Sequence, residues 1–566
     1  MIEHKSPISG IAAHAGRLVA TAGYDNQVIL WDHEQRVALG RGTHDHLANQ
    51  LAFSRDGRYL VSSSSDHTAR LWSVPGMKLL AVMPDHVDDV EMSAFHPIDS
   101  LVATASRDHD LCVYDFTGKL VRRFSGHAAD VISVCWSQDG RELISSSDDG
   151  TVKRWCFQDG RVVDDHDLGG VETDTVAIAA DGAIFAGNDE GDVVVLRDGR
   201  AERMRLHAAG IKRLVLNEPE QLLVSLSYDR TLRVSSTASG ALVPRAQAAI
   251  PAQVWPRSCA FLDAGTLVFA TFGTSYALYD IASDTWDLST VRPTAGFNAV
   301  AMHAGCRLTI GDSGILGMDG EQRSRLGSLC NFLTPAGERV FTGGQLGVVF
   351  DALSGERLHQ HRSPINCGAA FERNGVAHVI LGTYTGEGLV FSVASSGAVA
   401  LVATLQLHQN AVKGVAVSGD AIFAVCADCS ASWFSVSSLS EVARVQTAHD
   451  RIANGCTSLP GGRFASISRD HKLRIWAGNQ AEVVDTPHTH SIKCVAASGD
   501  GRFIATGSYY GVIAVYDTST SSWTSCLRIA AAGISSLCFD EQGQRFVASS
   551  YDGGVHEIGS HVDGQR

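Results

Sequence analysis

The chain has 566 residues, of which 45% are hydrophobic and 19% charged, and its formal net charge is −15. A chain of this length exceeds one ordinary hydrophobic core, so we expect more than one domain. The acidic balance and the lack of a basic run argue against nucleic acid or an anionic membrane as the main partner. No apolar run approaches the roughly 18 residues of a spanning helix, and the first ten residues lack a signal-peptide core. We therefore expect a soluble cytoplasmic protein.

Thirteen cysteines are scattered along the chain, an odd number that is unlike a small disulfide scaffold. Cys426 and Cys429 form a lone C-x-x-C motif, CADC, with no second pair nearby. Zinc sites usually combine two such pairs, or one pair with two histidines. We interpret most of the cysteines as small core residues, with metal binding or redox activity at CADC as the weaker alternative, and expect no metal and no cofactor.

One pattern recurs along the chain. It appears as TAGYDNQVILW (21–31), SSSSDHTARLW (62–72), TASRDHDLCVY (104–114), SSSDDGTVKRW (145–155), SISRDHKLRIW (466–476) and TGSYYGVIAVY (506–516). Each stretch ends in an aromatic residue and has Ser or Thr ten residues earlier, and five of the six have Asp six residues earlier. A period of about forty residues indicates one supersecondary unit used many times.

The unit is built from short strands. In residues 127–155, VISVCW, ELISS and VKRW predict three strands, and SQDG and DDGT predict the turns between them. A further short stretch follows each aromatic residue, such as RVALG (36–40) or KLVRRF (119–124), and predicts a fourth strand. Four antiparallel strands repeated every forty residues or so are typical of propeller blades.

In this pattern the chain resembles the WD40-repeat family over nearly its whole length. Fourteen units can be counted by the residues that close their third strands: Trp31, Trp72, Tyr114, Trp155, Leu196, Ser235, Tyr279, Met318, Phe350, Phe391, Phe434, Trp476, Tyr516 and Ile558. The resemblance implies an all-β fold of two seven-bladed WD40-type propellers in tandem. We place the first in residues 1–290 and the second, more degenerate one in residues 291–566. The exact blade limits within 291–440 stay open.

The resemblance also implies a hydrogen-bonded tetrad of His, Ser/Thr, Asp and Trp in a blade. Four units match fully: His4, Thr21, Asp25 and Trp31; His44, Ser62, Asp66 and Trp72; His127, Ser145, Asp149 and Trp155; His449, Ser466, Asp470 and Trp476. These groups can chain donors to acceptors, whereas each would cost roughly 1–3 kcal/mol if it were buried unpaired. A catalytic or metal-binding role is the weaker alternative because such sites are usually single constellations. We assign no catalytic residue.

Three further units match in part. His86, Thr104 and Asp108 are followed by Tyr114 instead of Trp; His207, Ser225 and Asp229 by Ser235; and His488 and Thr506 by Tyr516, with Tyr510 at the Asp position. Units eight to eleven lack most of the tetrad, since Leu308 and Ala424 replace the hydroxyl residue and Gly344 replaces the Asp. Divergence of that surface for another task and simple drift both explain this loss, and drift is the simpler explanation.

In WD40-like propellers the residue just before the turn Asp tends to face the top surface around the central channel. Here those positions include Tyr24, Arg107 and Tyr228 in the first half and Arg469, Tyr509 and Tyr551 in the second. Tyr and Arg are enriched in interaction hot spots, so these residues are our candidates for binding an acidic or aromatic peptide. The alternative is that the tyrosines pack on neighbouring blades and the arginines pair with nearby carboxylates.

The last unit raises a question of closure. After Ile558 only GSHVDGQR follows, which leaves no good fourth strand. The blade is then three-stranded or closed by the tail, which we favour, or its open edge pairs with a strand from a partner or a second copy.

These observations predict a non-catalytic scaffold or adaptor that binds one or more proteins or peptides through its propeller faces. One alternative is a sensor or regulatory subunit of a bacterial signalling or defence complex with a separate catalytic partner. Another is an enzyme that uses a propeller funnel. The sequence contains neither a G-x-x-x-x-G-K-[ST] phosphate loop nor a G-x-S-x-G nucleophile elbow.

Overall fold

The computed structural model describes residues 2–238 and 241–559. The chain divides into two compact units, Met1–Pro293 and Thr294–Arg566, which we call the first ring and the second ring. The division falls after Pro293, whereas the sequence suggested a boundary after residue 290. The described residues form strands and turns throughout, and none of them builds a helix of the length and hydropathy needed to cross a bilayer.

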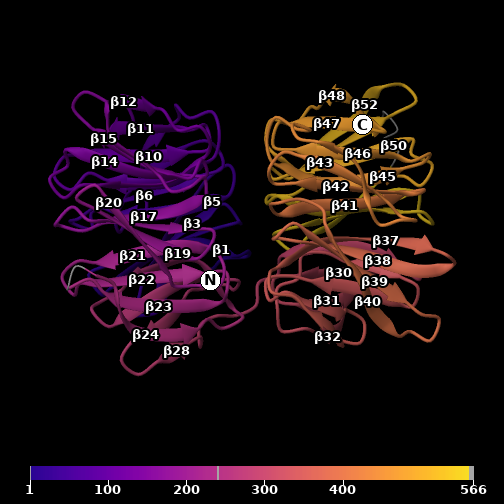
Figure 1. Ribbon diagram of the computed structural model, residues 1–566, viewed down its shortest axis with the longest axis horizontal. Helices are drawn as coiled ribbons and strands as arrows, with labels where there is room; N and C mark the ends of the chain where they lie inside the picture. Colours follow the sequence, from indigo (N-terminus) through magenta and orange to yellow (C-terminus); the bar gives the residue numbers. More distant parts are fainter. Residues whose placement is uncertain (1, 239–240, 560–566) are drawn as a thin grey trace. The chain divides into compact units, whose positions relative to one another are not determined.

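The first ring contains seven antiparallel sheets of four strands, each made from consecutive strands (Figure 1, indigo to magenta). We number the sheets as blades in chain order. Blade 1 is β1 (Ile8–His14), β2 (Leu18–Gly23), β3 (Gln27–Asp32), β4 (Val37–Thr43); blade 2 is β5 (Ala48–Phe53), β6 (Tyr59–Ser64), β7 (Ala69–Ser73), β8 (Leu79–Met83); blade 3 is β9 (Val90–Phe95), β10 (Leu101–Ser106), β11 (Asp110–Asp115), β12 (Leu120–Ser125); blade 4 is β13 (Val131–Trp136), β14 (Glu142–Ser147), β15 (Thr151–Cys156), β16 (Val162–Asp167); blade 5 is β17 (Thr173–Ile178), β18 (Ile184–Asn188), β19 (Asp192–Arg197), β20 (Arg200–Arg205); blade 6 is β21 (Ile211–Asn217), β22 (Leu222–Ser227), β23 (Thr231–Ser236), β24 (Val243–Ala249); blade 7 is β25 (Val254–Phe261), β26 (Thr266–Thr271), β27 (Ala277–Asp280), β28 (Thr285–Asp287).

The second ring contains six such sheets and, within the described residues, one sheet of three strands (Figure 1, pink to yellow). Blade 8 is β29 (Phe297–His303), β30 (Cys306–Gly311), β31 (Ile315–Met318), β32 (Glu321–Arg325); blade 9 is β33 (Thr334–Ala336), β34 (Arg339–Gly343), β35 (Val348–Asp351), β36 (Arg357–Gln360); blade 10 is β37 (Ile365–Arg373), β38 (Val376–Thr383), β39 (Glu387–Val393), β40 (Val399–Gln406); blade 11 is β41 (Val412–Ser418), β42 (Ala421–Cys426), β43 (Ala431–Ser435), β44 (Glu441–Val445); blade 12 is β45 (Ala453–Leu459), β46 (Arg463–Ser468), β47 (Lys472–Ala477), β48 (Gln480–Asp485); blade 13 is β49 (Ile492–Ala497), β50 (Phe503–Ser508), β51 (Val512–Asp517), β52 (Ser522–Arg528); blade 14 is β53 (Ile534–Asp540), β54 (Arg545–Ser550), β55 (Val555–Gly559).

The first strands of neighbouring blades contact one another around each unit. In the first ring the series closes where β25 of blade 7 contacts β1 of blade 1, and in the second where β53 contacts β29. Each unit is therefore a closed ring of seven sheets. The predicted fold class, all-β with two seven-bladed propellers, is confirmed.

Burial follows position within the blade. The second and third strands are covered by neighbouring blades on both faces, so all six residues of β3 and five of the six in β2 are buried. Small Ala, Ser and Thr side chains are frequent in second strands such as β2 (LVATAG) and β6 (YLVSSS) and let the sheets pack closely there. The fourth strand is the outer edge, and all six residues of β20, RAERMR, are exposed. Charges along such an edge discourage pairing with other chains.

The first strand of most blades carries a β-bulge immediately after its first residue. In β37 the register shifts between Ile365 and Cys367, which leaves Asn366 without a partner in β38. We call this place in each blade the bulge position. Asn366 donates its Nδ2–H to the carbonyl oxygen of Val412 in β41 at 2.8 Å, so the bulge residue joins one inner strand to the next.

Blade 14 has three strands, β53, β54 and β55, within the described residues. The tail that would close the blade, residues 560–566, lies outside the part of the chain that the structure describes. Closure by the tail and pairing with a partner strand therefore both stay predictions.

Candidate functional site

The predicted tetrads lie together inside their blades. In blade 4, Nε1–H of Trp155 donates to Oγ of Ser145 at 2.8 Å, and this hydroxyl lies 2.8 Å from Nε2 of His127. Nδ1 of His127 lies 2.9 Å from the Asp149 carboxylate. One order of protons satisfies all four groups: indole to hydroxyl, hydroxyl to Nε2, and Nδ1–H to carboxylate.

Blades 1 and 2 repeat this geometry. The hydroxyl of Thr21 lies 2.8 Å from both Trp31 Nε1 and His4 Nε2, and His4 Nδ1 lies 3.0 Å from Asp25. In blade 2 the three corresponding distances are 2.8, 2.7 and 2.9 Å, with Trp72, Ser62, His44 and Asp66 as the partners.

The tetrad carboxylates are held in the ionised state. Burial raises the pKa of Asp108 in blade 3, but hydrogen bonds from His86 and from the backbone N–H groups of Val87 and Asp110 outweigh it, so the pKa falls to about 2. The same opposition lowers the pKa of Asp25 and of Asp66. An ionised carboxylate that accepts several hydrogen bonds from the turn stabilises that turn and has little capacity left for another ligand.

Blade 12 departs from the pattern through a residue that the sequence did not suggest. Ser466 still joins Trp476 Nε1 and His449 Nε2 at 2.8 Å, but His449 Nδ1 lies 3.7 Å from Asp470. Arg474 enters between them and donates Nη1–H to His449 Nδ1 at 2.9 Å and to Asp470 at 2.6 Å. Because guanidinium only donates, Nδ1 of His449 must accept here, the reverse of its role in blades 1, 2 and 4.

The partial matches show what each replacement changes. In blade 13, Tyr510 stands at the Asp position, stacks on His490 at 4.2 Å, and leaves Nδ1 of the buried His488 without a hydrogen-bond partner among the described residues. In blade 6, Ser235 stands where Trp155 stands in blade 4. A pocket of about 240 Å³ that opens to solvent lies beside Ser235 and is also lined by Leu206 and β24.

Leu206 compensates in part for that missing indole. It occupies the position just before the tetrad His, where blade 4 has Gly126. A Cβ at Gly126 would lie 3.2 Å from the Trp155 ring, so a larger side chain there would require this ring to shift.

Ser145 and Ser146 allow a direct test of the tetrad, since both are fully buried and adjacent in β14. Ser145→Ala removes the shared hydroxyl and should lower the free energy of unfolding by about 1–3 kcal/mol. Oγ of Ser146 has no hydrogen-bond partner among the described residues, so Ser146→Ala should be neutral or stabilising. Urea unfolding of the two variants checks this, and equal losses in both would contradict the tetrad's role.

The candidate binding residues sit at equivalent places in their blades. The backbone N–H of each donates to a carbonyl that precedes or begins the inner strand: Tyr24 to Pro7, Arg107 to Asp89, Tyr228 to Gly210, Arg469 to Ile452, Tyr509 to Ser491 and Tyr551 to Gly533. This repeated bond puts them at the same end of their ring, beside the bulge positions. We call this end the mouth.

In the first ring, Tyr24, Arg107 and Tyr228 gather around Arg257, a residue of β25. Burial lowers the pKa of Arg257, but interactions with Tyr24, Glu91 and Tyr228 outweigh it and hold the pKa above its usual range. Arg257 reaches across from blade 7 to Glu91 of blade 3 at 3.4 Å. Arg107 pairs with Glu91 and Asp130, both at 2.5 Å, so the predicted alternative of carboxylate pairing describes its state here.

Acidic groups outnumber basic ones in the first mouth. Lys212, at the bulge position of blade 6, pairs with Asp174 at 2.5 Å and with Asp189. Burial raises the pKa of Asp174 to about 7, with the neighbouring Asp189 adding to the rise. The carboxyl groups that interact here with Arg107, Lys212 and Arg257 are Asp89, Glu91, Asp130, Asp148, Asp174 and Asp189.

In the second ring, Tyr509 and Tyr551 stack on each other with ring centroids 6.2 Å apart. They are only 9% and 7% exposed, so most of each ring already packs against this chain. Arg469 from the neighbouring blade 12 is partly exposed. A partner would therefore touch the rims of these tyrosines rather than their faces.

Three residues of the second mouth were missed from the sequence. Lys413 and Lys493 occupy bulge positions in blades 11 and 13, and Tyr384 precedes the tight turn of blade 10. Tyr384 escaped notice because Thr385 stands where the turn Asp belongs. The lysines could have been found by examining the residue that follows the first buried residue of each inner strand.

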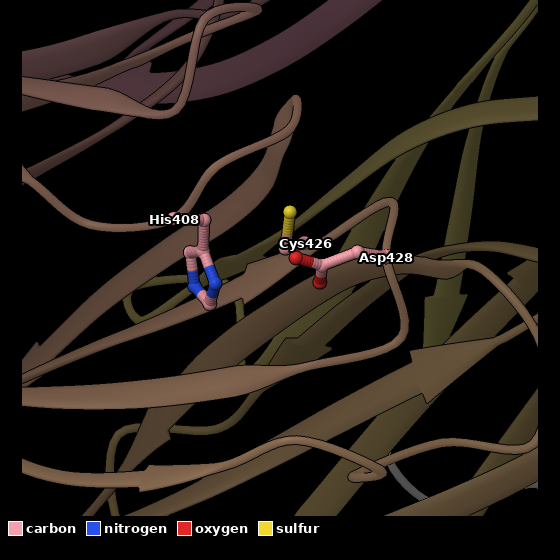
Figure 2. A group of neighbouring side chains, drawn as sticks. All are labelled: His408, Cys426 and Asp428. Atoms are coloured by element: carbon pink, nitrogen blue, oxygen red, sulfur yellow. The ribbon is translucent and has the colours of Figure 1, made fainter. Parts of the chain in front are cut away.

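The CADC motif belongs to a degenerate tetrad. His408, Cys426 and Asp428 place possible metal-ligand atoms within 4.8 Å of one another (Figure 2). However, His408 Nδ1 lies 2.8 Å from Ser430 Oγ, and its Nε2 lies 3.1 Å from Ser432 Oγ. Figure 2 shows Sγ of Cys426 pointing away from the imidazole nitrogens.

The electrostatics of this group also disfavour a cation. Arg444 lies 3.3 Å from Nδ1 of His408. Burial lowers the pKa of His408 to about 4 and raises that of Cys426 to about 12. Because thiolate is the metal-binding form of cysteine, a thiol with a raised pKa is a poor ligand. We interpret the group as a modified tetrad of blade 11. Ala424 stands at the Ser/Thr position and Phe434 at the Trp position, and His408 is hydrogen-bonded to Ser430 and Ser432 instead.

Comparison with known proteins agrees with this architecture. The sequence profile of the family described as "WD domain, G-beta repeat" matches residues 1–32, 41–73, 77–115, 118–156 and 481–517. The "Transcription initiation factor TFIID subunit 5" of Caenorhabditis elegans is 32% identical over 189 residues, which are 32% of this chain and 29% of that protein.

Two other relatives match at a similar level. The "Target of rapamycin complex subunit wat1" of Schizosaccharomyces pombe is 25% identical over 39% of this chain and 74% of its own length. The "WD repeat-containing protein 1" of Gallus gallus is 31% identical over 25% of this chain and 24% of its own length. The chain thus spans less than a third of the TFIID subunit and of the Gallus gallus protein. Residues 1–156 and 481–517 thus contain matches to the WD repeat, and the fourteen blades with their tetrads make the chain similar to WD40-repeat proteins.

Proposed function

We propose that this chain is a non-catalytic scaffold that binds protein partners at the mouths of its two rings. The observation that carries the proposal is that each blade uses one set of side chains for its internal hydrogen bonds and places another set at the mouth. The His, Ser/Thr and Asp side chains that resemble catalytic groups are engaged in tetrads, for example His127 with Ser145 and Asp149. Arg and Tyr side chains, by contrast, recur at the mouths of the rings. Two relatives bear the names of complex subunits, which supports an adaptor role for this chain.

The nature of each mouth further supports protein partners. Tyr and Arg give large contact areas at low entropic cost and are enriched in interaction hot spots. The first mouth is rich in carboxylates, which is unfavourable for nucleic acid. We also propose a cytoplasmic location, which fits thirteen free cysteines, one of them, Cys526, exposed.

Affinity purification of the tagged full chain from its own cells, followed by mass spectrometry, tests the scaffold proposal. We expect at least one protein to be enriched with the wild type and lost with a mouth variant, either Tyr228→Ala or Arg469→Ala. Arg323→Ala, on the exposed outer strand β32, serves as the control and should retain the partner. If no protein depends on either mouth and the purified chain turns over a substrate, the proposal is wrong.

A further inference from the structure

The bulge positions of the second ring mostly serve to join its blades. In blades 8, 10 and 12 an asparagine at this position donates Nδ2–H to the neighbouring inner strand or the segment before it: Asn298 to Cys330 at 3.1 Å, Asn366 to Val412 at 2.8 Å, and Asn454 to Ile492 at 2.7 Å. In blade 9 Asn331, which lies just before β33, makes the same kind of bond to Ile365 at 3.0 Å. Asparagine at the bulge position thus has a structural role, since it links neighbouring blades by a hydrogen bond to the backbone.

Two other blades carry lysine instead of asparagine at the bulge position. Lys413 in blade 11 and Lys493 in blade 13 stand on either side of Asn454 in blade 12. Neither ammonium group forms a hydrogen bond or ion pair with any described residue. Nζ of Lys413 lies instead 5.0 Å from the ring centre of Tyr384, and Nζ of Lys493 lies 6.0 Å from that of Tyr509.

Lys212 of the first ring provides the comparison, because it occupies the same bulge position in blade 6. Its ammonium group is held between the carboxylates of Asp174 and Asp189. The first mouth therefore neutralises its bulge lysine with its own carboxylates, whereas no described residue of the second mouth places an anion beside Lys413 or Lys493.

Arg469 adds a third positive charge to this cluster. Burial and repulsion from Lys493 and Arg469 together lower the pKa of Lys413 to about 8. Like charges gathered in a partly desolvated site repel one another, and an anion placed among them relieves that repulsion. Lys413, Lys493, Arg469 and Tyr384 are each partly exposed, so a ligand can reach them.

We propose that the mouth of the second ring binds an acidic segment of a partner protein, with a side-chain carboxylate placed between Lys413 and Lys493 and beside Arg469. This inference rests on the proposed scaffold function and specifies the chemistry of one partner segment. The rims of Tyr384, Tyr509 and Tyr551 supply contact area for the rest of a peptide, which a small free anion would not use.

Asparagine at both lysine positions gives a sharp test. Lys413→Asn combined with Lys493→Asn installs the residue that blades 8, 10 and 12 already carry at the bulge position, so the double variant should keep the thermal stability of the wild type. Lys78→Asn combined with Lys119→Asn is the matched control, since it removes the same charge from two exposed positions of the first ring.

The probe is a fluorescein-labelled peptide, Gly-Ser-Glu-Glu-Tyr-Glu-Glu-Gly, whose binding to the full chain is followed by anisotropy. We expect saturable binding to the wild type and to the control. The asparagine double variant should lose about tenfold or more in affinity, since charge-assisted hydrogen bonds are the strong ones. The same peptide with glutamine in place of glutamate should bind at least as weakly to the wild type.

Three results would overturn the inference: equal binding of the glutamate peptide to the double variant, equal binding of the glutamine peptide, or displacement of the peptide by inorganic phosphate at equal concentration. The last would mark a site for small anions. Should the double variant misfold, Arg469→Gln in the same assay takes its place and should weaken binding. A co-purified partner that is retained while the peptide fails refutes only the acidic chemistry. Failure to recover any partner refutes the scaffold proposal itself.

Discussion

Replacing Asp470 with alanine should destabilise blade 12 by roughly 3–5 kcal/mol, because it removes one partner of a buried charge pair. Arg474 is 5% exposed, and its Nη1 lies 2.6 Å from the Asp470 carboxylate. Asp470 also accepts the backbone N–H groups of Lys472 and Asp450, at 2.9 and 3.2 Å. The variant would leave a guanidinium and two N–H groups to find new partners.

Asp450 provides the control for this prediction. It pairs with the same arginine at 3.3 Å, but its side chain is 66% exposed. Asp450→Ala should therefore cost less than about 1 kcal/mol. Urea unfolding followed by tryptophan fluorescence measures both variants, and hydrogen exchange over residues 453–485 locates the loss. Similar losses from the two variants would show that burial does not govern this network.

Replacing Asp312 with asparagine should stabilise the second ring at neutral and alkaline pH. Asp312 is 6% exposed, and its carboxyl group contacts Asn298 Nδ2 at 2.8 Å and Thr294 Oγ1 at 3.2 Å. Burial raises its pKa from 3.8 to about 7, against the smaller effect of these two hydrogen bonds. Above pH 7 the folded chain must carry this buried charge with only neutral hydrogen-bond partners among the described residues.

The direction of the pH dependence follows from that raised pKa. The folded state binds the Asp312 proton more tightly than the unfolded state does, so this contribution to stability is complete below about pH 4 and is lost as the pH rises through 7. Asp312→Asn should gain roughly 2–4 kcal/mol at pH 8, since each pKa unit corresponds to about 1.4 kcal/mol, and should match the wild type at pH 4.

Thermal melts of Asp312→Asn and wild type between pH 4 and 8 measure this difference. Asp485→Asn is the control, because the side chain of Asp485 is 93% exposed and its change should be small and nearly constant with pH. A difference between Asp312→Asn and wild type that does not grow with pH would rule out a buried carboxyl group at this place.

The tetrads could be predicted because their spacing fixes their geometry. Ser145 and Trp155, ten residues apart, fall on adjacent strands joined by one tight turn, and Asp149 lies in that turn. The same spacing in blade 12 could not reveal Arg474, because nothing in a strand pattern tells whether a long side chain turns inward or stays in solvent. Its distance of four residues from Asp470 carries no meaning in a strand as it would in a helix.

The mouths were only partly predictable. Tyr24, Arg107, Tyr228, Arg469, Tyr509 and Tyr551 were identified from the turn pattern, and their role in binding stays a prediction. Lys413 and Lys493 were missed because a bulge shifts the register by one residue, and a strict alternation of inward and outward residues then assigns them wrongly. The positions of Asp174 and Asp189 beside Lys212 also depend on contacts between blades, which no pattern within one blade can give.

Both rings close without a shared strand in the described residues, since every sheet is made from consecutive strands. At the junction of blades 7 and 1, contacts between β1 and β25 and isolated bonds such as His4 N–H to the carbonyl oxygen of Thr274 at 3.1 Å hold the circle. Each blade is consequently one uninterrupted stretch of coding sequence. An in-frame duplication or loss of one such stretch would change the size of a ring without rewiring any sheet, which makes blade number a property that can change in a single genetic event.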